Sequence, residues 1–379
     1  MEAVAGLWSY VVSFLVVLTV LVFVHELGHY WVARRNGVRV DVFSIGFGPE
    51  LFGWTDRAGT RWKFSAIPLG GYVKMFGDAD PAGSPDSNLA ELSAAEREVS
   101  FHHKRLGQRA AVVAAGPLAN FLFAIVVFAG VFSVVGQPFT PPVIGGILPG
   151  SAAERAALQV GDRVLSINGT EIERFEQIQR IVQLNLDRPL ELTVLRDGRE
   201  VELVVTPTVV EETDSRGNTV RMARLGVHSL RGSVEYVRHD PIEAVWRGIA
   251  ETWIQTAGTL QALGQMIAGQ RQADDLGGPL RIAQMSGEVA QGGAAALLVF
   301  MAVLSINLGL INLFPVPMLD GGHLLFYVIE AIRGRPLGPR AQEYGFRIGL
   351  VLVFSLMVFA TWNDLRYLRI VQYLVDLVS

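Results

Sequence analysis

Two histidines and a glutamate near the N-terminus have the spacing of a metal-dependent hydrolase site. The sequence reads Val24-His25-Glu26-Leu27-Gly28-His29, which is the pattern H-E-x-x-H. On a helix, His25 and His29 are four residues apart and share one face, so their imidazoles can hold one Zn²⁺. Glu26 follows the first ligand and can act as a general base toward water without binding the metal. We therefore predict His25 and His29 as metal ligands and Glu26 as the catalytic residue.

Four long uncharged stretches predict that the chain spans a membrane: residues 3–24, 110–135, 292–319 and 348–362. A spanning helix needs about 20 apolar residues, which the first three stretches supply and the fourth supplies if Arg347 snorkels. Of all residues, 50% are hydrophobic and 18% are charged, whereas soluble domains average about 25% charged residues. The composition argues against a soluble cytosolic protein, and a net charge of −4 gives no basic excess for binding nucleic acid.

Basic residues predict the orientation of the chain, since cytoplasmic loops are rich in Lys and Arg. They follow the first span and precede the second: Arg34, Arg35, Arg39, Lys104, Arg105 and Arg109. The loop 34–109 is therefore predicted to be cytoplasmic, and the segment 137–291 is predicted to lie outside. His25, Glu26 and His29 then lie at the cytoplasmic end of the first span, where burying ionisable side chains is costly and indicates a function.

A catalytic zinc ion takes three protein ligands and keeps one position open, so a third ligand must come from elsewhere. The chain has no cysteine, which leaves histidines and carboxylates and excludes disulfides and iron–sulfur clusters. Four histidines are expected to be solvated or to lie on the outer side: His102, His103, His228 and His239. Prolines break the third span near the depth of His25, which indicates a cavity. From the residues alone, Asp320 and His323 remain rival third ligands, and Asp320 can also cap the next helix.

Residues 40–75 have the pattern of a β-hairpin on the cytoplasmic side. Short strands are predicted at Val40–Ile45, Arg61–Ile67 and Gly71–Met75, with a bend at Gly70 and Gly71. Such a hairpin could pair with an unwound substrate strand, or it could be a solvated hairpin with no role in substrate binding. Asn312 is a candidate donor to the oxyanion that forms during hydrolysis, or equally an amide that packs helices.

Residues 142–228 change to a more polar pattern, which predicts a small α+β domain. The predicted strands and helices are Val143–Leu148, Ala152–Leu158, Arg163–Ile167, Phe175–Leu184, Leu190–Arg196 and Glu200–Thr206. The residues Pro149–Ala153, Leu158–Val164 and Ile167–Gly169 resemble a bacterial PDZ domain. That resemblance implies a peptide-binding strand at Leu225, Gly226 and Val227.

A further helix is predicted over Ile242–Ala268, because Asp240 and Pro241 form a typical N-cap and first-turn pair. It carries Trp246 and Trp253 seven residues apart. Two arrangements are open for this helix, since it could lie on the membrane surface or pack on its neighbours.

Several motifs together resemble the site-2 protease family of intramembrane zinc metalloproteases. They are His25–His29, Pro68–Lys74, Gly116–Asn120, and Asn312 with Pro315–Gly322. Within that family the chain is most similar to the bacterial regulators of sigma-E protease, although it fits one PDZ domain and not two. The resemblance implies that Asp320 is the third ligand and that the cofactor is one Zn²⁺ per chain. The implied fold is a polytopic α-helical membrane protein with about four transmembrane helices, a cytoplasmic-side β-hairpin and an inserted α+β PDZ domain.

The function implied by the resemblance is cleavage of transmembrane segments in a bacterial inner membrane, with the PDZ domain in the periplasm. The implied partners are the lipid bilayer and single-span substrates, namely a pre-cleaved anti-sigma factor and signal-peptide remnants, with no nucleic acid. The alternatives are a membrane-anchored protease of non-membrane substrates, a metal-ion transporter and a PDZ scaffold. The expected segments are helix 1–36, loop 37–106, helix 107–136, PDZ domain 137–230, helical linker 231–291, helix 292–319, motif and loop 320–344, helix 345–363 and tail 364–379.

Overall fold

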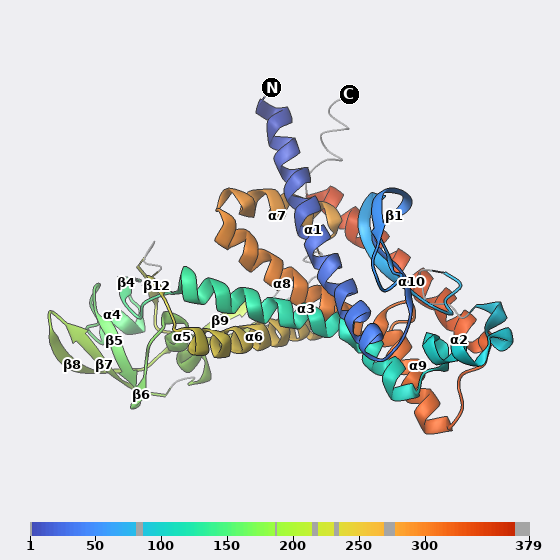
Figure 1. The fold of residues 1–379 in the computed structure, drawn as a ribbon. Helices are drawn as coiled ribbons and strands as arrows, with labels where there is room; N and C mark the ends of the chain where they lie inside the picture. The colour runs from blue at the N-terminus through green and yellow to red at the C-terminus, as the bar shows by residue number, and fades with distance from the viewer. Residues whose placement is uncertain are drawn as a thin grey trace, which may run out of the picture. The chain divides into compact units, whose positions relative to one another are not determined.

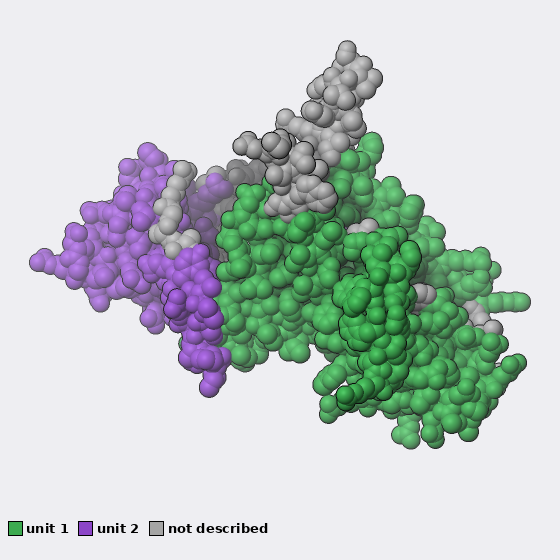
Figure 2. Space-filling view, turned by 45° about the horizontal axis from the view of Figure 1, so that its top comes forward, with its two compact units in different colours: residues 1–131, 243–262, 273–379 green, residues 132–242, 263–272 purple. Residues whose placement is uncertain are grey.

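The computed structural model describes residues 2–80, 86–185, 188–213, 219–230, 235–268 and 277–367. The chain divides into two compact units, which Figure 2 colours separately. Unit 1 contains residues 1–131, 243–262 and 273–379, and unit 2 contains residues 132–242 and 263–272. From residue 368 onward, the expected C-terminal tail lies outside the described residues.

Among the described residues, four helices are long and apolar enough to cross a membrane. They are α1 (Glu2–Arg35), α3 (Leu106–Val134), α8 (Ala294–Leu313) and α10 (Pro339–Tyr367). These helices coincide with the four predicted stretches. On α3, the side chains of Leu118, Leu122 and Val126 are exposed along one face. Exposed apolar side chains are expected where a helix faces lipid, and a helix is suited to lipid because it satisfies its own backbone hydrogen bonds.

Further helices lie between the four candidate spans along the chain. They are η1 (Ser87–Glu91), α2 (Ala94–Val99), η2 (Phe101–His103), α6 (Pro241–Ile267), α7 (Pro279–Gln291) and α9 (Asp320–Arg333). The sequence did not predict α7, which falls in the expected linker. Asp364 of α10 holds the N-terminus of α7, because its carboxylate accepts hydrogen bonds from the backbone N–H groups of Gly278, Leu280 and Arg281.

Helix α6 packs on the spans through its small residues. A Cβ added at Gly248 would lie 2.8 Å from the carbonyl oxygen of Ile125 in α3, and the two helices run side by side in Figure 1. The hydroxyl of Thr259 donates to the amide oxygen of Asn307 in α8 at 3.1 Å. Trp246 and Trp253 remain exposed. Helix α6 therefore packs on its neighbours, and a position of its exposed tryptophans on the membrane surface stays a prediction.

The cytoplasmic loop predicted from the sequence contains a long antiparallel hairpin of β1 (Val40–Thr55) and β2 (Arg61–Met75). Strand β1 is ten residues longer than predicted. The positive φ angles of Gly46 (90°) and Gly48 (86°) let the chain bend and resume its pairing with β2. Strand β2 contacts α1, so the hairpin is fixed beside the helix that carries the H-E-x-x-H pattern.

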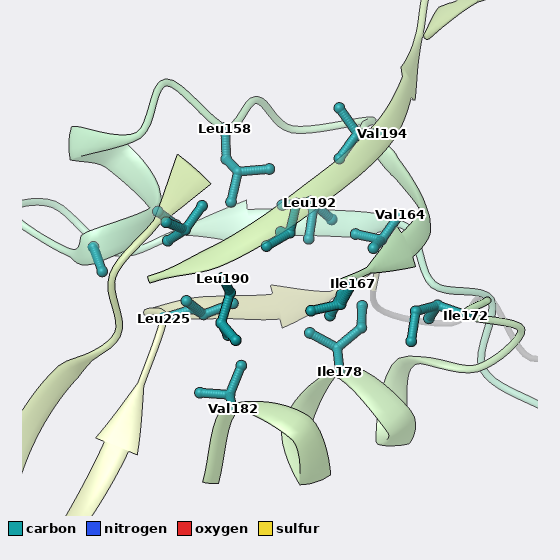
Figure 3. Close-up of a cluster of buried hydrophobic side chains, with 14 of the residues drawn as sticks. Leu158, Val164, Ile167, Ile172, Ile178, Val182, Leu190, Leu192, Val194 and Leu225 are labelled. Carbon is teal, nitrogen blue, oxygen red and sulfur yellow. The ribbon is translucent and has the colours of Figure 1, made fainter. Parts of the chain in front are cut away.

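Unit 2 is built around a four-stranded antiparallel sheet in the order β6-β5-β7-β8. Its strands are β5 (Arg163–Ile167), β6 (Thr170–Glu171), β7 (Leu190–Arg196) and β8 (Arg199–Val205), and its helices are α4 (Ala152–Arg155) and α5 (Phe175–Leu184). The bounds of β5, β7 and α5 agree with the prediction, β8 is shifted by one residue, and β6 was not predicted. Helix α4 ends three residues early because Ala157 has a φ of 57°. The core shown in Figure 3 forms where Ile178 and Val182 of α5 pack against sheet residues such as Leu190.

Three pairs of strands complete unit 2. They are β3 (Gln137–Phe139) with β12 (Glu235–Val237), β4 (Ile144–Ile147) with β11 (Val227–Ser229), and β9 (Thr208–Thr213) with β10 (Thr219–Arg224). The β3–β12 ribbon brings the two ends of the unit together. The unit is therefore inserted into the chain through a two-stranded neck.

Candidate metal centre

Three potential ligand atoms from distant parts of the sequence converge at one point in unit 1. The Nε2 atoms of His25 and His29 lie 3.2 Å apart, and the Oδ2 atom of Asp320 lies 3.2 Å from the first and 3.5 Å from the second. Tetrahedral coordination with metal–ligand bonds of about 2.0–2.1 Å separates the ligand atoms by about 3.3–3.4 Å. The observed triangle therefore has the size of one face of a zinc tetrahedron.

The cluster also has the chemistry of a metal site. The Oδ2 atom of Asp320 is buried and has no hydrogen-bond partner, which is costly unless a cation compensates the buried oxygen. Both histidines are buried as well. Two nitrogens and one carboxylate oxygen form the donor set that a catalytic zinc ion takes. The residues present therefore fit the metal that the sequence predicts.

His29 is held in the orientation that a ligand needs. Its Nδ1 lies 2.9 Å from the carbonyl oxygen of Val112 in α3, so the Nδ1–H donates there and Nε2 keeps its lone pair for the metal. Gly116, one turn further along α3, makes room for the ring. A Cβ at this position would lie 2.2 Å from Nε2 of His29.

His25 is oriented by Asn120, whose side chain is fully buried in α3. The Nδ1 atom of His25 lies 3.1 Å from the amide of Asn120, and the amide oxygen as placed has no partner. When the amide is turned by 180°, its oxygen faces His25 and accepts a hydrogen bond from Nδ1–H of that ring. This orientation satisfies the buried oxygen and leaves Nε2 of His25 free to bind a metal.

Asp320 is delivered by an irregular turn between α8 and α9. Met318 adopts a φ of 83°, a left-handed conformation that is strained for a non-glycine residue and is common at functional sites. Gly321 and Gly322 follow, and a Cβ at either would lie within 2.4 Å of a carbonyl oxygen of Phe314 or Val316. The close turn holds Asp320 at the first position of α9, where its carboxylate reaches α1.

A cavity of about 230 Å³ opens beside the three ligand atoms. Glu26 lines it together with Val73 of β2. Gly71 lies against the side chain of Glu26, since a Cβ there would be 3.3 Å from Cγ of Glu26. The cavity thus combines the carboxylate of Glu26, the triangle of ligand atoms and the edge of β2. This arrangement is suited to metal-assisted hydrolysis of an extended chain.

The structure brings together most of the site residues predicted from the sequence. Asn312 and Gly71 line the cavity with Glu26, whereas Gly70, with a φ of 118°, packs against the ring of Phe47. His323 also lines the cavity but does not belong to the ligand triangle, and burial lowers its pKa. The remaining predicted residues, Leu225, Gly226 and Val227, lie in unit 2, where Leu225 is buried in the core and Val227 begins β11.

Two residues of the segment between α1 and α3 differ from the sequence-based expectation or were missed by it. His102 was expected to be solvated, but its side chain is mostly buried and its Nε2 lies 2.9 Å from Oδ1 of Asp78. Asp78 itself lines the cavity. The separation of Asp78 from the H-E-x-x-H pattern along the sequence matches no known motif, so its place in the cavity was not predictable from the sequence.

Comparison with known proteins identifies relatives along the whole chain. The family model described as peptidase family M50 matches residues 13–356. A candidate zinc metalloprotease of Rhizobium meliloti is 49% identical over 359 residues, which are 94% of this chain and 96% of the relative. A similar candidate from Agrobacterium fabrum is 48% identical over 371 residues, which are 97% and 98% of the two chains. Metalloprotease MmpA of Caulobacter vibrioides is 37% identical over 394 residues, 97% and 98% of the two chains.

One solved structure, the PDZ domain of an SdrC-like protein from Listeria monocytogenes, shares 11% identity and covers 24% of this chain and 90% of that chain. Its TM-score of 0.20 is too low to support an argument about this fold. The full-length sequence relatives and the family model carry the assignment. The chain therefore belongs to peptidase family M50, the family of the site-2 proteases that its motifs resemble.

Proposed function

We propose that this chain is an intramembrane endopeptidase that cleaves transmembrane segments of single-span proteins. Its family and its relatives make it a zinc metalloprotease. The observation that carries the intramembrane assignment is that His25, Glu26 and His29 belong to α1, a helix whose window Tyr10–Arg35 is apolar enough to span a membrane. The proposed location is a bacterial inner membrane, with the cavity toward the cytoplasm and unit 2 in the periplasm.

The proposed mechanism assigns His25, His29 and Asp320 as the residues that hold zinc. When bound, zinc supplies Lewis acidity toward the peptide carbonyl and toward water. Glu26 accepts a proton from the attacking water on its carboxylate and returns it to the leaving nitrogen. Asn312 lines the same cavity and is proposed to donate a hydrogen bond to the developing oxyanion. The strand edge around Gly70 and Gly71 is proposed to hold the unwound substrate segment.

The roles of the site residues are tested by metal content and cleavage measured together. Glu26→Gln should keep one zinc ion per chain and lose turnover by about 10²–10⁴-fold, because only the general base is removed. Asp320→Asn should lose both zinc and cleavage, and His323→Ala should be milder. Zinc loss in the His323 variant with retention in the Asp320 variant would show that His323 is the third ligand. The substrate is a single-span reporter in liposomes, and a soluble unfolded protein tests the alternative of non-membrane substrates.

We also propose that unit 2 makes cleavage conditional on an earlier cut, by excluding substrates with bulky outer domains. An anti-sigma factor shortened by another protease and signal-peptide remnants are the proposed substrates. Removal of residues 142–228 should permit cleavage of an uncut single-span reporter and leave the zinc content unchanged. If the uncut reporter is still rejected, the selection lies elsewhere in the chain.

The alternative role of unit 2 is to bind the newly exposed end of the substrate near Leu225, Gly226 and Val227. A substitution at Gly226 is a poor test, because its φ is 78° and a Cβ would lie 2.2 Å from Cβ of Ser151. A synthetic peptide that matches the cut end is a better probe. It should slow cleavage of the shortened reporter if the end is bound, and it should have no effect if unit 2 acts by exclusion.

A further inference from the structure

A buried carboxylate lines the catalytic cavity but has no part in the mechanism above. Asp78 follows β2 by three residues, and its side chain is only 4% exposed. It shares the cavity with Glu26 and Asp320. A buried carboxylate is costly unless hydrogen bonds compensate its charge, so the partners of Asp78 indicate what it does.

Both carboxylate oxygens of Asp78 have a specific partner. Oδ2 accepts the backbone N–H of Met75 at 2.8 Å, and Oδ1 accepts a hydrogen bond from Nε2 of His102 at 2.9 Å. The backbone N–H of Asp78 in turn donates to the carbonyl oxygen of Met75 at 3.1 Å. Asp78 therefore closes a turn at the end of β2 and ties that end to η2.

The neighbouring backbone joins the same segments. The N–H of Phe76 donates to the carbonyl oxygen of Arg39 at 2.8 Å, and the N–H of Phe101 donates to that of Phe76 at 3.1 Å. Met75 and Phe101 are buried in one hydrophobic cluster and also line the cavity. The end of β2 is thus held between the start of β1 and η2, and Asp78 is the charged member of this junction.

The strand that Asp78 anchors also contacts the general base. Val73 lies two residues before Met75 and lines the cavity together with Glu26. Gly71 lies against the side chain of Glu26. A shift of the end of β2 would therefore be passed along the strand to the residue that must face the attacking water. A misplacement of about 1 Å in such a group can cost about 10²-fold in rate.

We propose that Asp78, held by His102, is a positioning residue of the peptidase reaction: it fixes the end of β2 so that the strand edge at Gly71 and Val73 keeps Glu26 aligned with the metal centre. The inference rests on the proposed function. It predicts a specific loss of turnover when the junction is broken, without loss of the metal, because none of the three proposed zinc ligands depends on Asp78 for a hydrogen bond.

The test uses the full-length enzyme in liposomes with a fluorogenic single-span reporter peptide. Asp78→Ala should lower kcat by about 10–100-fold, with KM and the zinc content close to wild type. His102→Ala should lower kcat in the same direction, and His102→Gln should restore it, since the Gln amide places an N–H donor near the position of Nε2. If Asp78→Ala does not fold, the two His102 variants decide the question.

Asp56→Ala is the matched control for a general loss of hairpin stability. Asp56 lies in the turn between β1 and β2 and does not line the cavity. It accepts hydrogen bonds from the N–H groups of Ala58 and Thr60, from Nε1 of Trp62 and from the hydroxyl of Tyr30 in α1. It should keep a wild-type kcat. The proposal is overturned if Asp78→Ala keeps kcat within about twofold of wild type, if Asp56→Ala loses as much, if the Asp78 variant loses zinc, or if His102→Gln is as impaired as His102→Ala. Failure of the proposed function looks different: the wild type would not cleave the reporter, or Glu26→Gln would cleave it equally well.

Discussion

Replacing Gly116 by alanine should abolish metal binding while leaving α3, the helix that contains Gly116, intact. The added Cβ would lie 2.2 Å from Nε2, 2.5 Å from Cε1 and 2.8 Å from Cδ2 of His29. Carbon atoms approach such neighbours to about 3.5 Å, so the ring must retreat by roughly 1 Å. Zinc–nitrogen bonds tolerate deviations of about 0.2 Å. The shift therefore exceeds what the ligand geometry allows, and His29 ceases to bind.

The expected result for Gly116→Ala is less than one zinc ion per chain and a loss of cleavage of at least about 10²-fold. Gly130→Ala is the matched control, because it lies in the same helix and nothing lies within 4 Å of its added Cβ. Alanine favours a helix over glycine by about 0.5–1 kcal/mol, so neither variant should lose helix stability for local reasons. Zinc is counted by mass spectrometry of the purified proteins. A Gly116→Ala enzyme with one zinc ion and a wild-type rate would refute the reasoning.

Three further predictions follow from the same geometry. Asn120→Ala should weaken zinc binding by about 10–100-fold, as measured by competition with a chelator, because His25 loses the partner that orients it. Gly71→Ala should lower turnover and keep zinc, because its Cβ would lie 2.7 Å from the carbonyl oxygen of Ser44 in the adjacent strand. In unit 2, burial raises the pKa of Asp162, but hydrogen bonds from Arg196 and a backbone N–H outweigh it and hold the pKa below its usual range. The stability that this carboxylate contributes should therefore be present above about pH 3.9 and be lost as the pH falls through its lower folded-state pKa. Hydrogen exchange of unit 2 should show this loss. Arg196→Met should make unit 2 exchange faster already at neutral pH, because it leaves the buried carboxylate of Asp162 without its ion-pair partner.

Features that depend on local spacing could be predicted from the sequence. His25 and His29 are four positions apart, which places both rings on one helix face, and an uncharged stretch of sufficient length predicts a span whatever the rest of the chain does. The strands of unit 2, such as Arg163–Ile167 and Leu190–Arg196, were predicted with their observed bounds. Alternating side chains and turn residues such as Asp197-Gly198 act over a few residues and therefore leave a readable pattern.

The set of distant residues that share the cavity becomes visible in the folded chain. From the residues alone His323 was a rival to Asp320, and the turn at Met318 brings the carboxylate, not the imidazole, to the two histidines. Asn120 belongs to the Gly116–Asn120 motif and Asp78 to no motif, and neither position shows by its spacing what the side chain contacts. Their roles arise from packing of α3 and β2 against α1. Long-range contacts of this kind depend on how helices and strands meet, and one sequence without its fold carries no period or spacing that records them.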